Sequence, residues 1–179
     1  TNSGASVWVQ VPLVKGNTDQ ELRMCWGLAS ATNESSGAAV FNAANGFACA
    51  LHLDAALKDE LGAVAPVNAG TTVGQGIIGR GRTFALGAGV NCGQQITNFP
   101  AGAQPHSTVC WIRPAAVGNV MSWGQAMPYS MVEVELPGPP HISIDTFFGG
   151  NINGTTTFSL AQWTHVAFVR SPTENRLYI

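Results

Sequence analysis

The chain has 179 residues, of which 8 are Lys or Arg and 10 are Asp or Glu, so the formal net charge is −2. Charged residues make up 10% of the sequence, against about 25% in an ordinary soluble domain. So little Glu, Lys and Arg excludes coiled coils and charge-patterned helical bundles, and the slightly negative charge excludes nucleic-acid binding through a basic surface. Because 45% of the residues are apolar, the chain can bury a core and we do not expect disorder.

Short strand-like segments run through the sequence, and 21 Gly and 10 Pro separate them. The patterns predict strands over residues 7–12, 21–26, 82–86, 108–113, 119–123, 130–136, 141–147 and 164–170, the last paired with 176–179. Helical propensity rises over residues 54–61, where Gly62 and Pro66 limit a helix to about two turns. Many short strands without long helices predict an all-β protein, an antiparallel sandwich or barrel. No apolar run is long enough to cross a bilayer.

The four cysteines do not show the C-x-x-C spacing of zinc ribbons or thioredoxin-like sites. Cys25, Cys49 and Cys110 lie in apolar runs, where we expect buried free thiols that pack as small hydrophobes. Cys92 follows a glycine-rich stretch and is the most exposed candidate. The sequence is compatible with one disulfide, and it does not show whether the protein works in an oxidising or a reducing compartment.

Several motifs in the second part of the chain follow one another in a characteristic order. They are GRGRTF (79–84), STVCWIRP (107–114), GNVMSWG (118–124), FSLAQWTHVAFVR (158–170) and NRLYI (175–179). This order resembles the laminin-G-like, concanavalin A-like jelly roll of bacterial surface proteins over residues 47–179. The resemblance implies a two-sheet antiparallel jelly-roll sandwich, truncated at its C-terminal end.

The N-terminal segment is similar to a second bacterial module, a domain of unknown function that often precedes such jelly rolls. The matching motifs are WVQVP (8–12), MCWG (24–27), AVFN (39–42) and ALHL (50–53). Some copies of this module are attached to ExbB/TolQ-type biopolymer transport proteins. The resemblance implies that residues 1–46 are the C-terminal part of such a β module, within a larger protein that is extracellular, at the cell surface or periplasmic.

Residues of catalytic type are present but do not form a complete motif. Glu133 and Glu135 share one face of a predicted strand, the arrangement from which a glycosidase of this fold would draw its acid and nucleophile. The glycosidases of this fold carry a motif similar to E-x-D-x-x-E, but in this sequence no third acid follows Glu135 along the strand. His52 and His165 lie in strand-like apolar segments, and no G-x-S-x-G motif accompanies them. We therefore expect both histidines to be packed and the protein not to be an enzyme, with no catalytic residue.

The remaining candidates concern ligands. The ligand-binding candidates are aromatic residues near predicted turns, Trp123, Tyr129, Phe147 and Phe148, whereas Trp111 and Trp163 are expected in the core. The laminin-G-like resemblance implies a calcium site as the cofactor to consider, with oxygen ligands from Asp59, Asp145, Asn151 and Asn153. It also implies binding or adhesion, with a glycan or a surface protein as partner. The alternatives are the extracytoplasmic domain of an ExbB/TolQ-type transport protein and a glycoside hydrolase fragment. The oligomeric state is left open.

Overall fold

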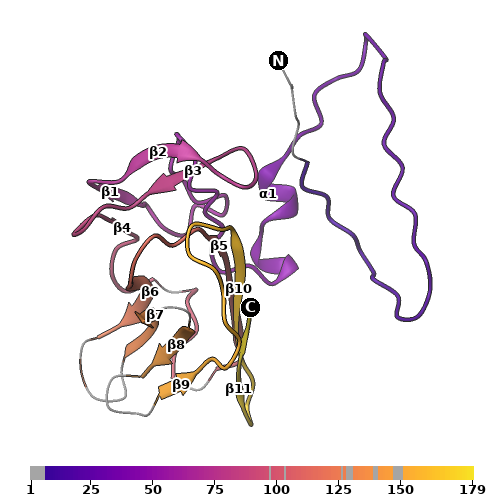
Figure 1. Ribbon diagram of the computed structural model, residues 1–179. Helices are drawn as coiled ribbons and strands as arrows, with labels where there is room; N and C mark the ends of the chain where they lie inside the picture. Colours follow the sequence, from indigo (N-terminus) through magenta and orange to yellow (C-terminus); the bar gives the residue numbers. More distant parts are fainter. Residues whose placement is uncertain are drawn as a thin grey trace. The chain divides into compact units, whose positions relative to one another are not determined.

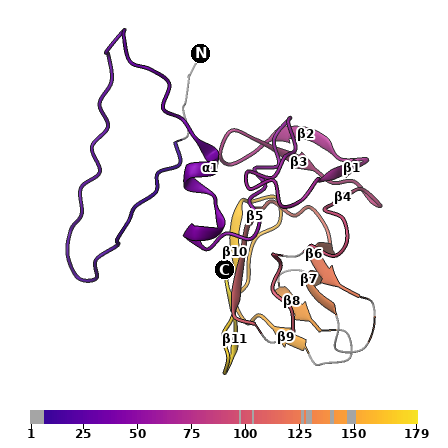
Figure 2. The ribbon, with the colours of Figure 1, turned by 180° about the vertical axis from the view of Figure 1, so that it is seen from behind.

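The computed structural model is strand-rich and divides the chain into two compact units (Figures 1 and 2), unit 1 over Thr1–Phe99 and unit 2 over Pro100–Ile179. It describes residues 7–96, 98–102, 104–125, 127, 131–138, 141–146 and 151–179. Every ladder between its named strands is antiparallel, which confirms the all-β prediction. No helix in these ranges has the length and apolar character needed to cross a bilayer.

Unit 2 contains two antiparallel sheets. Its strands are β5 (His106–Ile112), β6 (Gly118–Gly124), β7 (Met131–Gly138), β8 (His141–Asp145), β9 (Asn151–Asn153), β10 (Thr164–Arg170) and β11 (Asn175–Tyr178). One sheet has the order β11-β10-β5 and the other the order β6-β7-β8-β9 (Figure 1). The predicted strands of this part are confirmed to within a few residues, and so is the antiparallel pairing of β10 with β11.

The two sheets of unit 2 share one apolar core. Val134 and Leu136 from β7 and Ile142 and Ile144 from β8 form one cluster with two side chains of β10, Val166 and Phe168. These residues alternate along their strands, so each strand turns an apolar face to the core and its other face away from it. The residues of β7 and β8 that lie between these core positions therefore point to the opposite face of the sheet.

Unit 1 holds smaller elements. They are α1 (Gly37–Val40), the 3₁₀ turn η1 (Ala43–Asn45), and the strands β1 (Val67–Ala69), β2 (Thr72–Gln75), β3 (Arg80–Thr83) and β4 (Gly89–Asn91). The strands form two separate pairs, β1 with β4 and β2 with β3. Ser36 caps α1, because its Oγ accepts from the backbone N–H of Ala39 at 3.2 Å. Three of the helical residues are Gly or Ala, and this four-residue helix buries none of its side chains.

The predictions of strands over residues 7–12 and 21–26 were wrong. Both segments belong to a wide loop without strand assignment that precedes α1 (Figures 1 and 2). Their apolar side chains are exposed, for example Val9, Leu22 and Trp26. An alternating pattern becomes a strand only when a neighbouring strand supplies the ladder, and none of the strands in the described ranges pairs with this loop.

The predicted helix over residues 54–61 is also absent. Leu53 and Leu57 have left-handed backbone angles, with φ of 55° and 41°, which a right-handed helix does not contain. In addition, Oδ1 of Asp54 accepts from the backbone N–H of Ala56 at 2.9 Å. Such a local side-chain bond stabilises a turn in competition with the helix, and it explains why helical propensity failed here.

The shared core predicts where unit 2 is sensitive to substitution. Ile144→Ala should lower the free energy of unfolding by about 3 kcal/mol, because it leaves a cavity at a fully buried position. Urea unfolding followed by circular dichroism measures the change. The matched control is Val109→Ala on β5, where the side chain is 60% exposed and the expected change stays within about 0.5 kcal/mol. Equal effects of the two variants would contradict the described core.

Candidate functional site

The face of the β6-β7-β8-β9 sheet that points away from the core is polar. The ladders place Glu133 opposite Asp145 and Glu135 opposite Ser143. On the other side of β8, Asp145 faces Asn151 and Ser143 faces Asn153. Directly opposed residues of an antiparallel pair project to the same side of the sheet. We call this set the polar face, and its members are Asn119, Ser122, Glu133, Glu135, Ser143, Asp145, Asn151 and Asn153.

Neutral neighbours hold two carboxylates of the polar face in place. Nδ2 of Asn119 donates to Oε1 of Glu133 at 2.7 Å, and Oγ of Ser143 donates to Oε1 of Glu135 at 3.0 Å. Ser143 is 1% exposed, so its bond to Glu135 is shielded from water. The face therefore offers fixed acceptors beside amide and hydroxyl groups.

The predicted calcium ligands are divided between the two units. Asp145, Asn151 and Asn153 are brought together on the polar face by β8 and β9, whereas Asp59 lies in unit 1. Among the residues that the structure describes, no group of three or more His, Cys, Asp or Glu side chains is arranged to hold a metal ion. The calcium site therefore stays a prediction, with Asp59 assigned to unit 1 and the other three ligands to unit 2.

Of the four aromatic candidates, the structure describes Trp123. Trp123 packs partly against the core, with its ring centroid 5.6 Å from that of His106 and 6.2 Å from that of Phe168. Tyr129, Phe147 and Phe148 lie outside the described residues. The ligand-binding role of these four aromatic residues stays a prediction.

Trp111 and His165 were both expected to be packed inside, and this was wrong. Trp111 is 44% exposed, because Cys110 and Ile112 on either side of it pack against the core and alternation turns the indole outward. His165 is exposed too and lies directly opposite Trp111, with 5.1 Å between the ring centroids. Because residues 109–112 are all apolar, no polar residue in this run marked the side of the strand that faces outward.

The cysteines are free thiols in the structure. Cys25 is exposed, so its predicted burial was wrong, because the segment around it forms no strand; Cys49, Cys92 and Cys110 are half-buried. Burial, followed by the negative charge of Asp59, raises the pKa of Cys49 to about 12, and burial raises the pKa of Cys110 to about 11. Thiols that stay protonated at neutral pH are poor nucleophiles and poor metal ligands.

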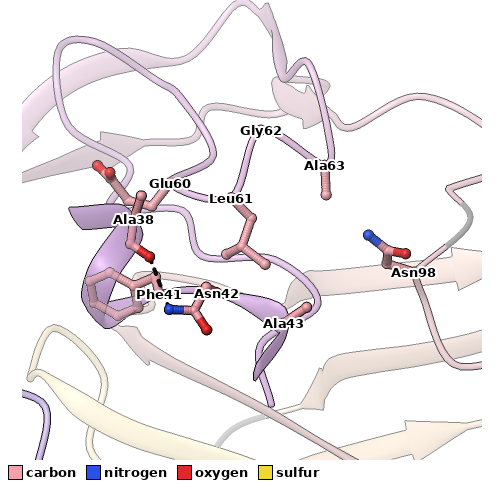
Figure 3. A pocket seen from close by; sticks show the side chains of 9 residues that line it. All are labelled: Ala38, Phe41, Asn42, Ala43, Glu60, Leu61, Gly62, Ala63 and Asn98. Atoms are coloured by element: carbon pink, nitrogen blue, oxygen red, sulfur yellow. Dashed lines mark hydrogen bonds between the residues drawn. The ribbon is translucent and has the colours of Figure 1, made fainter. Parts of the chain in front are cut away.

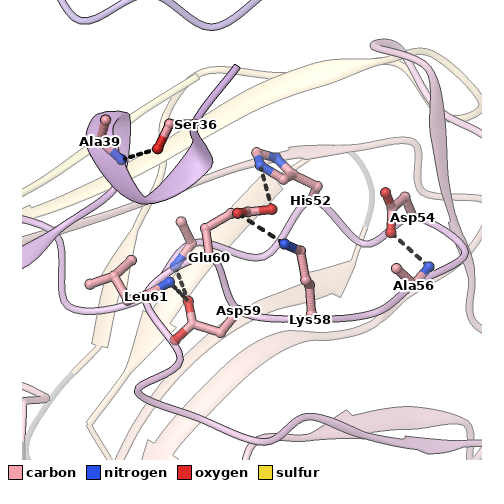
Figure 4. A network of polar contacts seen from close by, with 10 residues as sticks. Ser36, Ala39, His52, Asp54, Ala56, Lys58, Asp59, Glu60 and Leu61 are labelled. Carbon is pink, nitrogen blue, oxygen red and sulfur yellow. Dashed lines mark hydrogen bonds and ion pairs between the residues drawn. The ribbon is translucent and has the colours of Figure 1, made fainter. Parts of the chain in front are cut away.

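A cluster of aromatic rings joins three motif residues of unit 1. The ring of Phe41 lies 5.5 Å from that of Trp8 and 5.1 Å from that of His52, and Phe41 is 7% exposed. His52 is thus packed, as predicted. Its Nε2 lies 3.8 Å from Oε1 of Glu60, whose other oxygen contacts Nζ of Lys58 at 3.2 Å (Figure 4). The segments that carry these motif residues therefore meet in one packed cluster.

Unit 1 also has a hollow of about 300 Å³ beside α1, lined mainly by small and apolar side chains (Figure 3). Asn42 contributes an amide to its wall, but Nδ2 of this residue donates to the carbonyl oxygen of Ala38 at 3.0 Å. Glu60, the lining residue with an ionisable side chain, is already engaged by Lys58 and His52. The hollow therefore presents no free reactive group.

Asp59 has a structural role in the same unit. Its Oδ1 accepts from the backbone N–H groups of Ala50 and Leu61, and its Oδ2 accepts from those of Ala63 and Val64. The carboxylate thus joins two separate segments of backbone, and Figure 4 shows it beside Leu61. Burial opposes ionisation, but the four N–H donors outweigh it and hold the pKa of Asp59 below its ordinary value.

Comparison with known proteins finds a family match for the N-terminal segment. Residues 1–54 match the model of a domain of unknown function, DUF2341, a match that contains the Trp8, Phe41 and His52 cluster. No laminin-G-like family model matches, so the resemblance of residues 47–179 to that family and the domain boundary after residue 46 stay predictions. No curated protein and no solved structure matches the chain.

The role of Asp59 leads to a pH-dependent prediction. A lowered pKa in the folded state means that the carboxylate stabilises fully above about pH 5, and that this stabilisation is lost as the pH falls through the folded-state pKa. Asp59→Asn should lower the free energy of unfolding at pH 7 by about 3 kcal/mol, because the new amide N–H₂ faces backbone donors. The free energy of unfolding should also fall less between pH 7 and pH 3 in the variant than in the wild type.

Urea unfolding of wild type and variant at pH 7 and pH 3 tests this prediction. Asp19→Asn, at an exposed acid of the same unit, serves as the control and should leave both values unchanged. A stable Asp59→Asn protein with the acid sensitivity of wild type would show that the four hydrogen bonds are not important for stability.

Proposed function

We propose that this chain is a non-catalytic binding module of a larger exported protein, in which residues 47–179 are a laminin-G-like jelly roll that holds a glycan on the polar face of unit 2. The module would act outside the cytoplasm, at the cell surface or in the periplasm. The fold class gives this proposal its context, but the argument rests on the site itself.

The observation that carries the proposal is the polar face. Sugar hydroxyl groups both donate and accept hydrogen bonds, so a site for them needs fixed acceptors next to donors. Carboxylates and amides are neighbours on the face: in one row, Glu133 lies opposite Asp145, which lies opposite Asn151. Because Asn119 and Ser143 already hold two of the carboxylates, a ligand would lose little free energy in ordering them.

One observation favours the glycosidase alternative. Glu133 lies directly opposite Asp145, and opposed residues have Cβ atoms about 4.5–5.5 Å apart, which is near the carboxyl separation of about 5–5.5 Å in retaining glycosidases. The incomplete acid motif argues against it, because no third acid follows Glu135 on the strand. Binding without hydrolysis is therefore the better supported function.

Two other functions are alternatives to glycan binding, and the experiments below distinguish them from it. A surface protein would bind through the same hydrogen-bonding groups, and an extracytoplasmic domain of an ExbB/TolQ-type transport protein would need no glycan at all. The N-terminal match to DUF2341 is compatible with all of these. Glycan binding is the alternative that makes direct use of the polar face.

A glycan array followed by isothermal titration calorimetry tests the proposal. We expect binding of neutral oligosaccharides, and Glu133→Ala should weaken it about tenfold, because a charged hydrogen-bond acceptor is lost. Glu174→Ala is the control, since Glu174 is an exposed acid in the turn between β10 and β11. Titrations with calcium and with a chelator show whether the ion contributes. Absence of glycan binding under both conditions would refute the proposal.

A hydrolysis assay separates binding from catalysis. Wild-type protein incubated with the oligosaccharides that it binds should release no reducing ends. Glu133→Gln and Asp145→Asn should therefore change only the affinity. Hydrolysis by the wild type that disappears in both variants would replace the binding module with a glycosidase.

A further inference from the structure

One end of unit 2 brings together two nitrogen-bearing side chains from different strands. Arg170, the last residue of β10, lies directly opposite His106, the first residue of β5. Both side chains are on the side of the sheet that carries Phe168, which is 2% exposed and belongs to the core. They therefore lie at the edge of the space between the two sheets.

Polar atoms of both side chains are buried without a hydrogen-bond partner. They are Nε of Arg170 and Nε2 of His106. The other ring nitrogen, Nδ1 of His106, lies 2.9 Å from the carbonyl oxygen of Gln104. Since a carbonyl oxygen only accepts, Nδ1 carries a proton, and Nε2 is the atom left to interact with something else.

Arg170 differs in this respect from the other arginines of unit 2. Nε of Arg113 donates to the carbonyl oxygen of Ala161 at 2.8 Å, and Nη2 of Arg176 pairs with Glu174 at 2.6 Å. In the part of the chain that the structure describes, Arg170 forms no ion pair and no side-chain hydrogen bond. A buried guanidinium N–H without an acceptor is costly, so natural structures normally pair it.

We infer that Arg170, His106 and Trp123 bind an acidic sugar residue, such as a uronic acid, at this end of unit 2, with the carboxylate of the sugar on the guanidinium of Arg170. This inference rests on the proposed glycan-binding function. A carboxylate accepts from Nε and one Nη of a guanidinium in parallel, the geometry for which arginine is best suited. It would satisfy the unpaired Nε of Arg170, and Nε2 of His106, which accepts while Nδ1 carries the proton, can take a hydrogen bond from a hydroxyl group of the same sugar.

Trp123 favours a sugar acid over a simple inorganic anion. Its indole comes from β6 in the opposite sheet and meets His106 edge to face, with the ring planes at 77°. An indole offers apolar surface for the C–H face of a sugar ring beside the charged group. Glu174, in the turn after β10, does not compete for Arg170 because it is paired with Arg176.

Isothermal titration with oligogalacturonate, and with a neutral cello-oligosaccharide as reference, tests the inference. Wild type should bind the acidic oligosaccharide, and Arg170→Gln should weaken this binding by about tenfold or more without changing binding of the neutral sugar. Arg176→Gln is the control variant and should bind both sugars like wild type. If Arg170→Gln is not folded by circular dichroism, Arg170→Lys replaces it, because it keeps the charge but loses the planar fork, and should still weaken the acidic sugar selectively.

The outcomes distinguish this inference from the proposed function. Binding of the neutral sugar that depends on Glu133, together with no binding of oligogalacturonate, would overturn the carboxylate site and leave the polar face standing. Equal loss of oligogalacturonate in Arg170→Gln and Arg176→Gln would also overturn it, since that result reports general attraction to positive charge. No binding of either sugar would remove both.

Discussion

The apolar contact between the two sheets of unit 2 is the constraint from which its surfaces follow. Ile142 and Ile144 on β8 are fully buried against Val166 and Phe168 on β10. Burying these side chains removes apolar area from water and fixes which face of each strand points inward. A slip of one residue in β7 would turn Glu133 and Glu135 into the core, where unpaired carboxylates are far too costly. The core therefore determines where the polar groups stand.

The same alternation gives the candidate site its precision. The polar face is built on four neighbouring strands rather than on loops, so its groups are spaced by the ladder. Ser143 illustrates the result, because it lies between two core isoleucines in the sequence and still reaches Glu135 with its hydroxyl. The position of such a group is set by backbone pairing, and a ligand meets an arrangement that already exists.

The strands of unit 2 were predictable from sequence because each carries its own pattern. Residues 130–136 and 164–170 alternate strongly, and the structure has β7 and β10 there. The pairing of β10 with β11 was predicted, but the registers of the other strands were not: nothing in the sequence shows that Glu133 faces Asp145 or that Arg170 faces His106. The helix predicted over residues 54–61 in unit 1 does not form, because the side chains of Asp54 and Asp59 accept hydrogen bonds from nearby backbone N–H groups and stabilise a turn instead.

The two ligand-binding surfaces proposed for unit 2 are close in sequence and separate in space. Glu133 and Val132 are neighbours on β7, and their partners on β6 are Ser122 and Trp123. Because adjacent residues of a strand point to opposite faces, Glu133 belongs to the polar face while Trp123 turns toward the core side and His106. The sheet thus keeps an acidic surface apart from the guanidinium of Arg170. In the proposed function, a carboxylate-bearing ligand would be repelled by the first surface and attracted by the second, so the sheet itself would discriminate between neutral and acidic sugars.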